Sequence, residues 1–149
     1  MVDFKVAMRT TVLLVDDDIQ QLELRSLVLK TSGFTVLTAP GAVEAMSIME
    51  EHAANTVDVA VLDYHMPVMN GCVLAEYLRA RYPELKIVLH SGAFDISESE
   101  MRSIDAFVPK ADGVTRLLEE VSLVAQLRTG PLQAVAMHEV SLIPGADSL

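Results

Sequence analysis

Short apolar runs alternate with longer amphipathic segments along most of this chain. The runs are rich in Val, Leu and Ile, and they cover residues 11–15, 34–39, 57–62, 86–89 and 106–108. Short continuous apolar runs of this kind are typical of strands that are buried on both faces of a parallel sheet. The pattern therefore predicts five strands, separated by segments long enough to form crossover helices.

The segments between the runs repeat their apolar residues at the spacing of a helix. Leu22, Val28 and Leu29 fall near one face of a predicted helix over 19–32, and Gly33 is suited to end it because glycine accepts a positive φ angle. Pro40 opens the next predicted helix, where its missing N–H costs nothing. The apolar positions of that helix are Val43, Met46 and Met49. Further helices are predicted over 72–81, 97–103 and 113–128.

Strict alternation of strands and helices predicts one α/β domain: an open, doubly wound parallel sheet with helices on both faces. The alternation covers residues 10–128, and 149 residues fit a single domain. Residues 1–9 form an N-terminal extension and residues 129–149 a C-terminal tail. The tail can be disordered, extend the last helix or support a homodimer through Leu132, Val135 and Leu142, and we expect it to be flexible or loosely packed.

Charge and composition exclude several classes of protein. Eleven basic and 21 acidic residues give a net charge of −10, which argues against a nucleic-acid-binding surface. The longest stretch without a charge is residues 31–43, which is too short to cross a bilayer because a helix needs about 20 residues for that. The N-terminus has no apolar signal-peptide core, and the single cysteine, Cys72, cannot form an internal disulfide. We therefore expect a soluble, cytoplasmic protein without a membrane partner.

Acidic residues stand at the ends of two predicted strands. The first strand leads directly into Asp16, Asp17 and Asp18, and the third ends at Asp63. In a doubly wound sheet these two strand ends are neighbours, and sites form just outside the carboxyl ends of the strands. Carboxylates that meet there repel one another, and a divalent cation with oxygen ligands, Mg²⁺ above all, relieves the repulsion. Asp18 we interpret instead as the cap of the following helix.

Two further strand ends bring a hydroxyl and an ammonium group. Ser91, followed by Gly92, comes after the fourth predicted strand, and Lys110 comes after the fifth. A carboxylate nucleophile, a metal ion, a hydroxyl and an ammonium together suit in-line phosphoryl transfer, in which the protein positions the groups and neutralises charge on the phosphoryl oxygens.

With these residues in view, the sequence resembles a response-regulator receiver domain over roughly residues 10 to 128. The likeness rests on the acidic pair, on the segment Leu-Asp-Tyr-His-Met-Pro-Val-Met-Asn-Gly at 62–71, on Ser91 with Gly92, and on Phe107 with Lys110. The resemblance implies a stand-alone signalling module of two-component systems rather than an enzyme. It also implies the flavodoxin-like form of the fold, with strand order 2-1-3-4-5.

The resemblance further implies a role for each matching residue. Asp63 would accept a phosphoryl group from a histidine kinase or a phosphotransfer protein, and phosphorylation would switch the binding of a downstream protein partner. The remaining roles are Mg²⁺ binding by Asp16, Asp17, Asp63 and the backbone carbonyl of His65, phosphoryl contacts from Ser91 and Lys110, switching by Ser91 and Phe107, and tuning of the phosphoryl lifetime by His65 and Ala93.

The sequence departs from the receiver pattern in one region. Receivers commonly have Lys-Pro after the fifth strand, whereas here Lys110 is preceded by Pro109 and followed by Ala111. The interval from Ser91 to Lys110 is also short by about one helical turn, roughly four residues. We therefore expect the helix over 97–103 to lose a turn.

Two other functions stay open at this point. One is a receiver-like interaction module that is not phosphorylated, although such a module has no need of mutually repelling carboxylates. The other is a metal-dependent phosphohydrolase with Asp63 as nucleophile. Haloacid-dehalogenase-like enzymes place a second Asp two residues after the first, and this chain has His65 there. A flavodoxin-like FMN carrier is disfavoured because the three acidic residues at 16–18 would repel the flavin phosphate.

Overall fold

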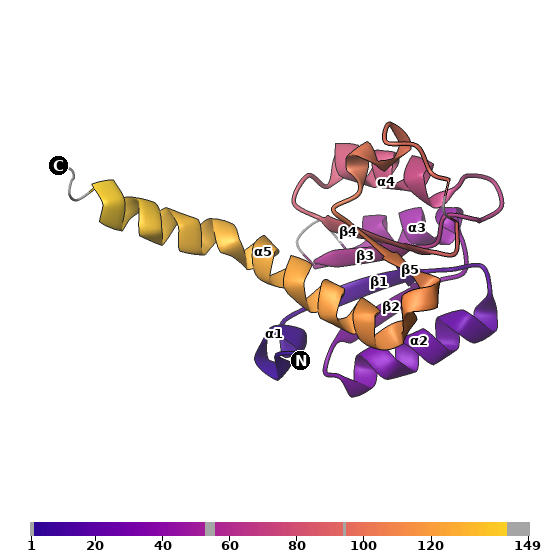
Figure 1. Ribbon diagram of the computed structural model, residues 1–149, viewed down its shortest axis with the longest axis horizontal. Coiled ribbons are helices and arrows are strands. Elements are labelled where there is room, and N and C mark those ends of the chain that lie inside the picture. Colours follow the sequence, from indigo (N-terminus) through magenta and orange to yellow (C-terminus); the bar gives the residue numbers. More distant parts are fainter. Residues whose placement is uncertain (1, 53–55, 94, 143–149) are drawn as a thin grey trace.

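The structure is a computed structural model that describes residues 2–52, 56–93 and 95–142, with side chains described as far as residue 127. Its centre is one sheet of five parallel strands in the order β2-β1-β3-β4-β5, as predicted (Figure 1). The strands are β1 (Thr11–Val15), β2 (Thr35–Ala39), β3 (Val59–Leu62), β4 (Lys86–Ser91) and β5 (Ala106–Pro109). The fold is therefore the doubly wound, flavodoxin-like one, in a single domain.

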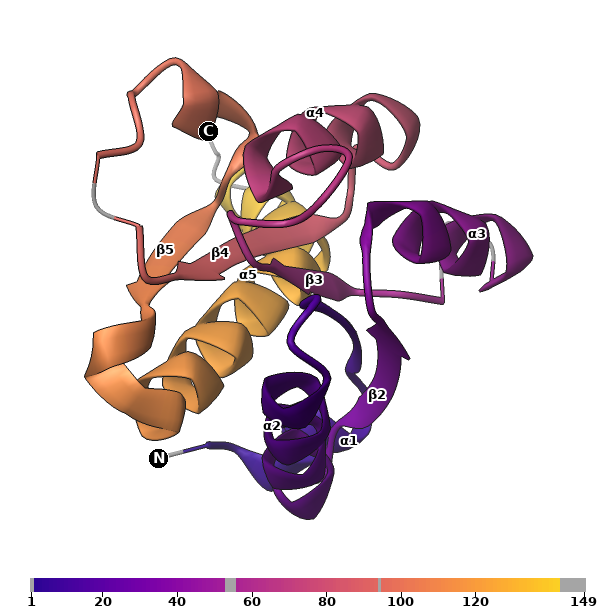
Figure 2. The same cartoon turned by 90° about the vertical axis from the view of Figure 1, so that its right-hand side faces the viewer.

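Helices cover both faces of the sheet (Figures 1 and 2). One face is covered by α3 (Ala42–His52) and α4 (Gly71–Arg81), and the other by α1 (Phe4–Met8), α2 (Ile19–Thr31) and α5 (Gly113–Leu142). Two short 3₁₀ helices, η1 (Glu100–Ser103) and η2 (Lys110–Asp112), flank β5. Asp18 caps α2 as expected, since its Oδ1 accepts a hydrogen bond from the Gln21 N–H at 3.2 Å.

The strands divide their side chains between two cores. In β3, Val59 and Val61 pack under α2 and α5, while Ala60 and Leu62 pack under α3 and α4. All four side chains are at most 2% exposed, which explains why the strand reads as a continuous apolar run rather than an alternating one.

Two predictions about helices were wrong. No α-helix forms over the described part of 97–103. Instead the chain makes the 3₁₀ turn η1, because that stretch contains a single apolar residue, Met101, with which to face the core. In α3 the buried positions are Ala42, Ala45 and Met49, whereas Val43 is 59% exposed. Small alanines at positions 42 and 45 line the inner face of this helix. Of the predicted apolar positions, Met49 is buried as expected, Met46 is partly buried and Val43 faces solvent.

Helical structure also extends beyond both ends of the predicted domain over residues 10–128. The N-terminal extension contains α1, which is capped by Asp3 and buries Ala7 completely. At the other end, α5 continues past residue 128 to Leu142 and extends away from the body of the protein (Figure 1). The proposed dimer contacts of Leu132, Val135 and Leu142 concern side chains outside the described residues. Within the described residues, no helix combines the length and the apolar character needed to cross a membrane.

Candidate functional site

Three carboxylates meet at the carboxyl ends of β1 and β3. The two strands pair in parallel with Val15 opposite Leu62, so the residues that follow them lie side by side. One carboxylate oxygen from each of Asp16, Asp17 and Asp63 lies within 4.8 Å of the others. Asp16 is 4% and Asp63 is 7% exposed, while Asp17 is open to solvent. The group thus has a buried floor and one accessible side.

Lys110 brings a positive charge to this group from the end of β5. Its Nζ donates to Oδ2 of Asp16 at 3.1 Å and to Oδ2 of Asp63 at 3.3 Å. Its side chain remains 26% exposed, so the ammonium sits at the rim of the site. The structure therefore brings together the four charged groups that the sequence analysis had placed at three different strand ends.

The surroundings of Asp63 shift its ionisation. Burial raises the pKa of the Asp63 carboxyl above its ordinary value; the ammonium of Lys110 lowers this pKa, the charge of Asp16 raises it, and the Ser91 hydroxyl lowers it. A carboxylate with so little water around it gains more from a cation or a new phosphorus bond than an exposed one does. The environment of Asp63 therefore suits a carboxylate nucleophile that acts beside a bound cation.

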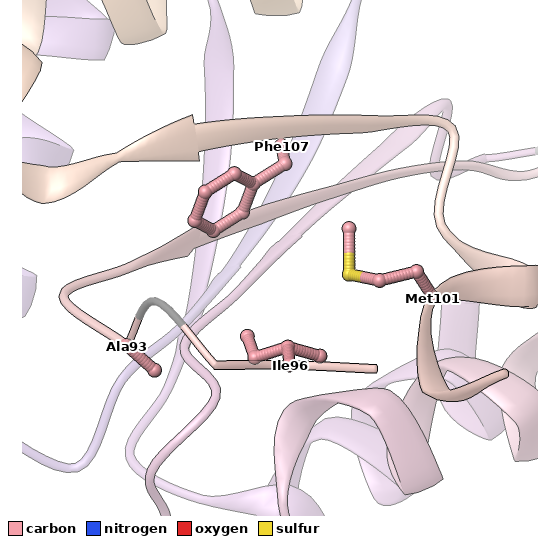
Figure 3. A pocket seen from close by; sticks show the side chains of 4 residues that line it. All are labelled: Ala93, Ile96, Met101 and Phe107. Carbon is pink, nitrogen blue, oxygen red and sulfur yellow. The ribbon is translucent and has the colours of Figure 1, made fainter. Parts of the chain in front are cut away.

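Ser91 ends β4 and is fully buried. Its Oγ accepts a hydrogen bond from the Ala93 N–H at 3.2 Å, which leaves the hydroxyl hydrogen for the carboxyl of Asp63. Ala93 in turn lines a small cavity of about 130 Å³ together with Phe107 from β5. Figure 3 shows the Phe107 ring directed into this cavity, with Ile96 and Met101 on its other sides.

Hydrogen bonds hold the loop between Asp63 and Gly71 in place. The Gly71 N–H donates to the Tyr64 carbonyl at 2.9 Å, and a Cβ at Gly71 would overlap the backbone oxygen of Asp63, so only glycine allows α4 to begin this close. The Tyr64 hydroxyl donates to Oε1 of Glu100 at 2.6 Å, which connects the loop to η1. His65 is exposed and lines the same open hollow as Asp17.

Arg25 also reaches the site, and the sequence analysis had not singled it out. Its Nη1 lies 3.3 Å from Oδ2 of Asp16, and its side chain is 12% exposed. A signal for it was present in the helical pattern, because residue 25 falls on the same face as Leu22 and Leu29, both of which are buried. A charged residue on a core-facing stripe needs a partner, and here the partner is Asp16.

Residues 12–122 match the response regulator receiver domain family. The chain belongs to this family. Receiver domains are parts of two-component phosphorelay systems, are generally non-enzymatic signalling modules, and interact with histidine kinases or phosphotransfer proteins. They bind Mg²⁺ at an aspartate cluster, and the group formed by Asp16, Asp17 and Asp63 is consistent with that.

Curated relatives are larger proteins that contain such a domain. The receiver is 35% identical over 116 residues to sensor kinase CckA of Brucella abortus, a match that covers 74% of this chain and 12% of CckA. It is 28% identical over 117 residues to heme response regulator HssR of Staphylococcus saprophyticus, which covers 77% of this chain and 51% of HssR. The chain thus spans about half of HssR and a smaller share of CckA.

Solved structures agree on the fold. Response regulator protein TrrA from Thermotoga maritima, in complex with Mg²⁺-BeF, superposes with a TM-score of 0.71 at 26% identity, covering 77% of this chain and 98% of TrrA. A CheY-like receiver domain protein from Methanospirillum hungatei gives a TM-score of 0.72 at 23% identity, covering 82% and 98% of the two chains.

Proposed function

We propose that this receiver accepts a phosphoryl group on Asp63 from a phosphorylated histidine of a histidine kinase or a phosphotransfer protein. The observation that carries the proposal is the placement of Lys110, whose ammonium bridges Asp63 and Asp16 across the ends of three strands. Such a cation lies where the oxygens of a phosphoryl group on Asp63 would need neutralising.

The transfer itself needs little from the protein beyond position and charge. An oxygen of Asp63 attacks phosphorus in line with the phosphorus–nitrogen bond of the donor, that bond breaks, and the imidazole leaves with its electron pair and takes up a proton. Lys110 donates to one phosphoryl oxygen and the Ser91 hydroxyl to another. Ser91 ends β4, which is adjacent to β3, and the ammonium of Lys110 already contacts Asp63, so neither group has to travel far.

The donor set of the site fits Mg²⁺. Asp16, Asp17 and Asp63 offer oxygen atoms only, and the exposed side of the group leaves room for water. The backbone carbonyl of His65 would be the fourth protein oxygen, since His65 and Asp17 border the same hollow. When bound, the ion neutralises charge on the attacking and transferred oxygens.

Phosphorylation would then be read out through Ser91 and Phe107. A bond from the Ser91 hydroxyl to the new phosphoryl group would draw β4 and the following Ala93 toward the site. Phe107 borders the cavity next to Ala93, and a turn of its ring would change the surface around η1, where a downstream protein would bind (Figure 3). His65 and Ala93 flank the site and would set how fast water reaches the phosphoryl group.

Incubation with acetyl phosphate and Mg²⁺, followed by intact-protein mass spectrometry, tests this function. We expect the addition of one phosphoryl group to the wild-type protein and to Glu23→Gln, which removes an exposed carboxylate of α2, and none to Asp63→Asn. No addition and no Mg²⁺ binding would favour the non-phosphorylated interaction module. Repeated turnover of a phosphomonoester that depends on Asp63 would favour the phosphohydrolase.

A further inference from the structure

Both oxygens of the Asp16 carboxylate are occupied before any metal ion arrives. Oδ1 accepts the Asp18 N–H at 2.9 Å. Oδ2 accepts from two cations, the ammonium of Lys110 at 3.1 Å and the guanidinium of Arg25 at 3.3 Å. A cation that approaches Asp16 therefore competes with hydrogen bonds that are already made.

The two basic residues are not equivalent. Lys110 spans Asp16 and Asp63, so it stays useful to the site when a phosphoryl group arrives on Asp63. Arg25 comes from α2, and the carboxylate that it contacts is that of Asp16, where it adds a second positive charge to the group. With three carboxylates and two bases, the formal charge of the group is −1, which is a weak attraction for a divalent cation.

A cavity lies beside Arg25. Arg25 lines this cavity of about 280 Å³ between α2 and α5, beside apolar side chains such as those of Leu24 and Val114 and beside Lys110. This space is partly open to solvent, so it offers the guanidinium room away from its contact with Asp16. A charged side chain that has both a partner and a free volume can occupy two positions.

We propose that Arg25 is a positioning residue of the metal site, which holds Asp16 in the ion-free receiver and withdraws when a divalent cation binds. This inference rests on the proposed function, because it assigns the metal to the same three carboxylates. Its consequence is that Arg25 lowers the affinity of the site for Mg²⁺. The receiver then requires a higher Mg²⁺ concentration before Asp63 is ready for transfer.

Direct measurement of Mg²⁺ binding by calorimetry tests the inference on the full chain. We expect Arg25→Gln to bind Mg²⁺ about tenfold more tightly than the wild type, the effect of one nearby unit charge on a divalent ion across a partly screened gap. Lys30→Gln removes the same charge from an exposed position on the same helix, and we expect its affinity to stay within about twofold of the wild type. Tighter binding is diagnostic, because damage to packing would weaken it.

A second measurement does not depend on the glutamine variant folding. In the wild-type protein, the NMR signal of the Arg25 side-chain Nε–H, assigned by its absence in Arg25→Lys, should shift during a Mg²⁺ titration. An unshifted signal, or an Arg25→Gln affinity equal to or weaker than that of the wild type, overturns the inference. If the wild type is phosphorylated in the same samples, the proposed function survives that result; if it neither binds Mg²⁺ nor is phosphorylated, both claims are wrong.

Discussion

Lys110 Nζ lies 3.3 Å from Oδ2 of Asp63, although 47 positions separate the two residues in the sequence. The contact forms because β3 and β5 flank β4 in a parallel sheet and deliver their following residues to the same edge. The same ammonium reaches Asp16 after β1, so a single side chain connects the ends of three strands.

Replacement of Lys110 should slow phosphorylation far more than it disturbs the fold. In Lys110→Met the phosphoryl oxygens lose a charged donor, and we expect the initial rate with acetyl phosphate to fall about a hundredfold, the usual cost of one such donor. Mass spectrometry at timed intervals gives the rate. Lys30→Met, an exposed lysine on α2, is the matched control. Equal rates for the two variants would show that Lys110 does not contact the transferred group.

A methyl group at Gly71 should destabilise the receiver and displace Asp63. The added Cβ would overlap the backbone oxygen of Asp63, so α4 or the loop after β3 has to shift. We expect Gly71→Ala to lower the free energy of unfolding by about 2 kcal/mol, as overpacking commonly does. Urea denaturation followed by circular dichroism measures the change.

Gly92 supplies the control for this substitution. A Cβ there would have no neighbour within 4 Å among the described residues, so Gly92→Ala should leave the free energy of unfolding close to that of the wild type. If the Gly71 and Gly92 variants were equally stable, the close approach of α4 to Asp63 would not be a feature of the protein in solution.

The bond between Tyr64 and Glu100 should be visible in the titration of Glu100. The hydrogen bond from the Tyr64 hydroxyl, with further bonds from Ser97, lowers the pKa of the Glu100 carboxyl below its ordinary value of 4.5. Tyr64→Phe removes the first of these donors, so the pKa of Glu100 should rise toward 4.5. Carbon-detected NMR of the glutamate side chains over the acid range follows this change. An unaltered pKa in the variant would mean that the phosphoacceptor loop is not tied to η1.

His90 should make the receiver less stable as the solution is acidified. Burial lowers the pKa of His90 to about 4; the Val108 carbonyl, which accepts from Nδ1 at 2.9 Å, raises this pKa, Arg25 and Lys110 lower it, and Asp16 raises it. Between pH 6.5 and about 4 the unfolded chain therefore binds a proton that the folded protein excludes, so stability falls as the pH falls.

The size of this effect can be isolated with one variant. Between pH 7 and pH 5 the wild type should lose about 2 kcal/mol more of its free energy of unfolding than His90→Gln, because a difference of one pKa unit corresponds to about 1.4 kcal/mol. Urea denaturation at the two pH values gives both losses. The same loss in both proteins would show that His90 is protonated as readily in the fold as outside it.

Much of the site could be predicted because strand ends in a parallel sheet have fixed neighbours. Asp16, Asp17, Asp63 and Lys110 each lie within two positions of the end of an apolar run, and the topology alone brings them to one edge. Arg25 could not be found in this way, because it lies in the middle of α2 and not at the end of a strand. Its position on the buried stripe of α2 was the available signal.

Other features depend on packing that no local pattern records. The five residues of α1 are too few for a periodic signal, and they are stabilised by Asp3 and by the burial of Ala7. Ser97, which precedes η1, and Glu100, which begins it, bond to each other, and the chain forms this 3₁₀ turn in place of the predicted α-helix. The continuation of α5 through Gly130 and Pro131 also runs against local preference, because both residues disfavour a helix interior.

The central claim is that Asp63 is the residue that carries the phosphoryl group, and reductive trapping tests it most directly. Sodium borohydride reduces an acyl phosphate of aspartate to homoserine, which marks the acceptor at a single position. After incubation with acetyl phosphate and Mg²⁺, tandem mass spectrometry of the digested protein should find homoserine at position 63 and aspartate at positions 16 and 17. Homoserine at another position, or none in a protein that binds Mg²⁺ and is folded, would contradict the account.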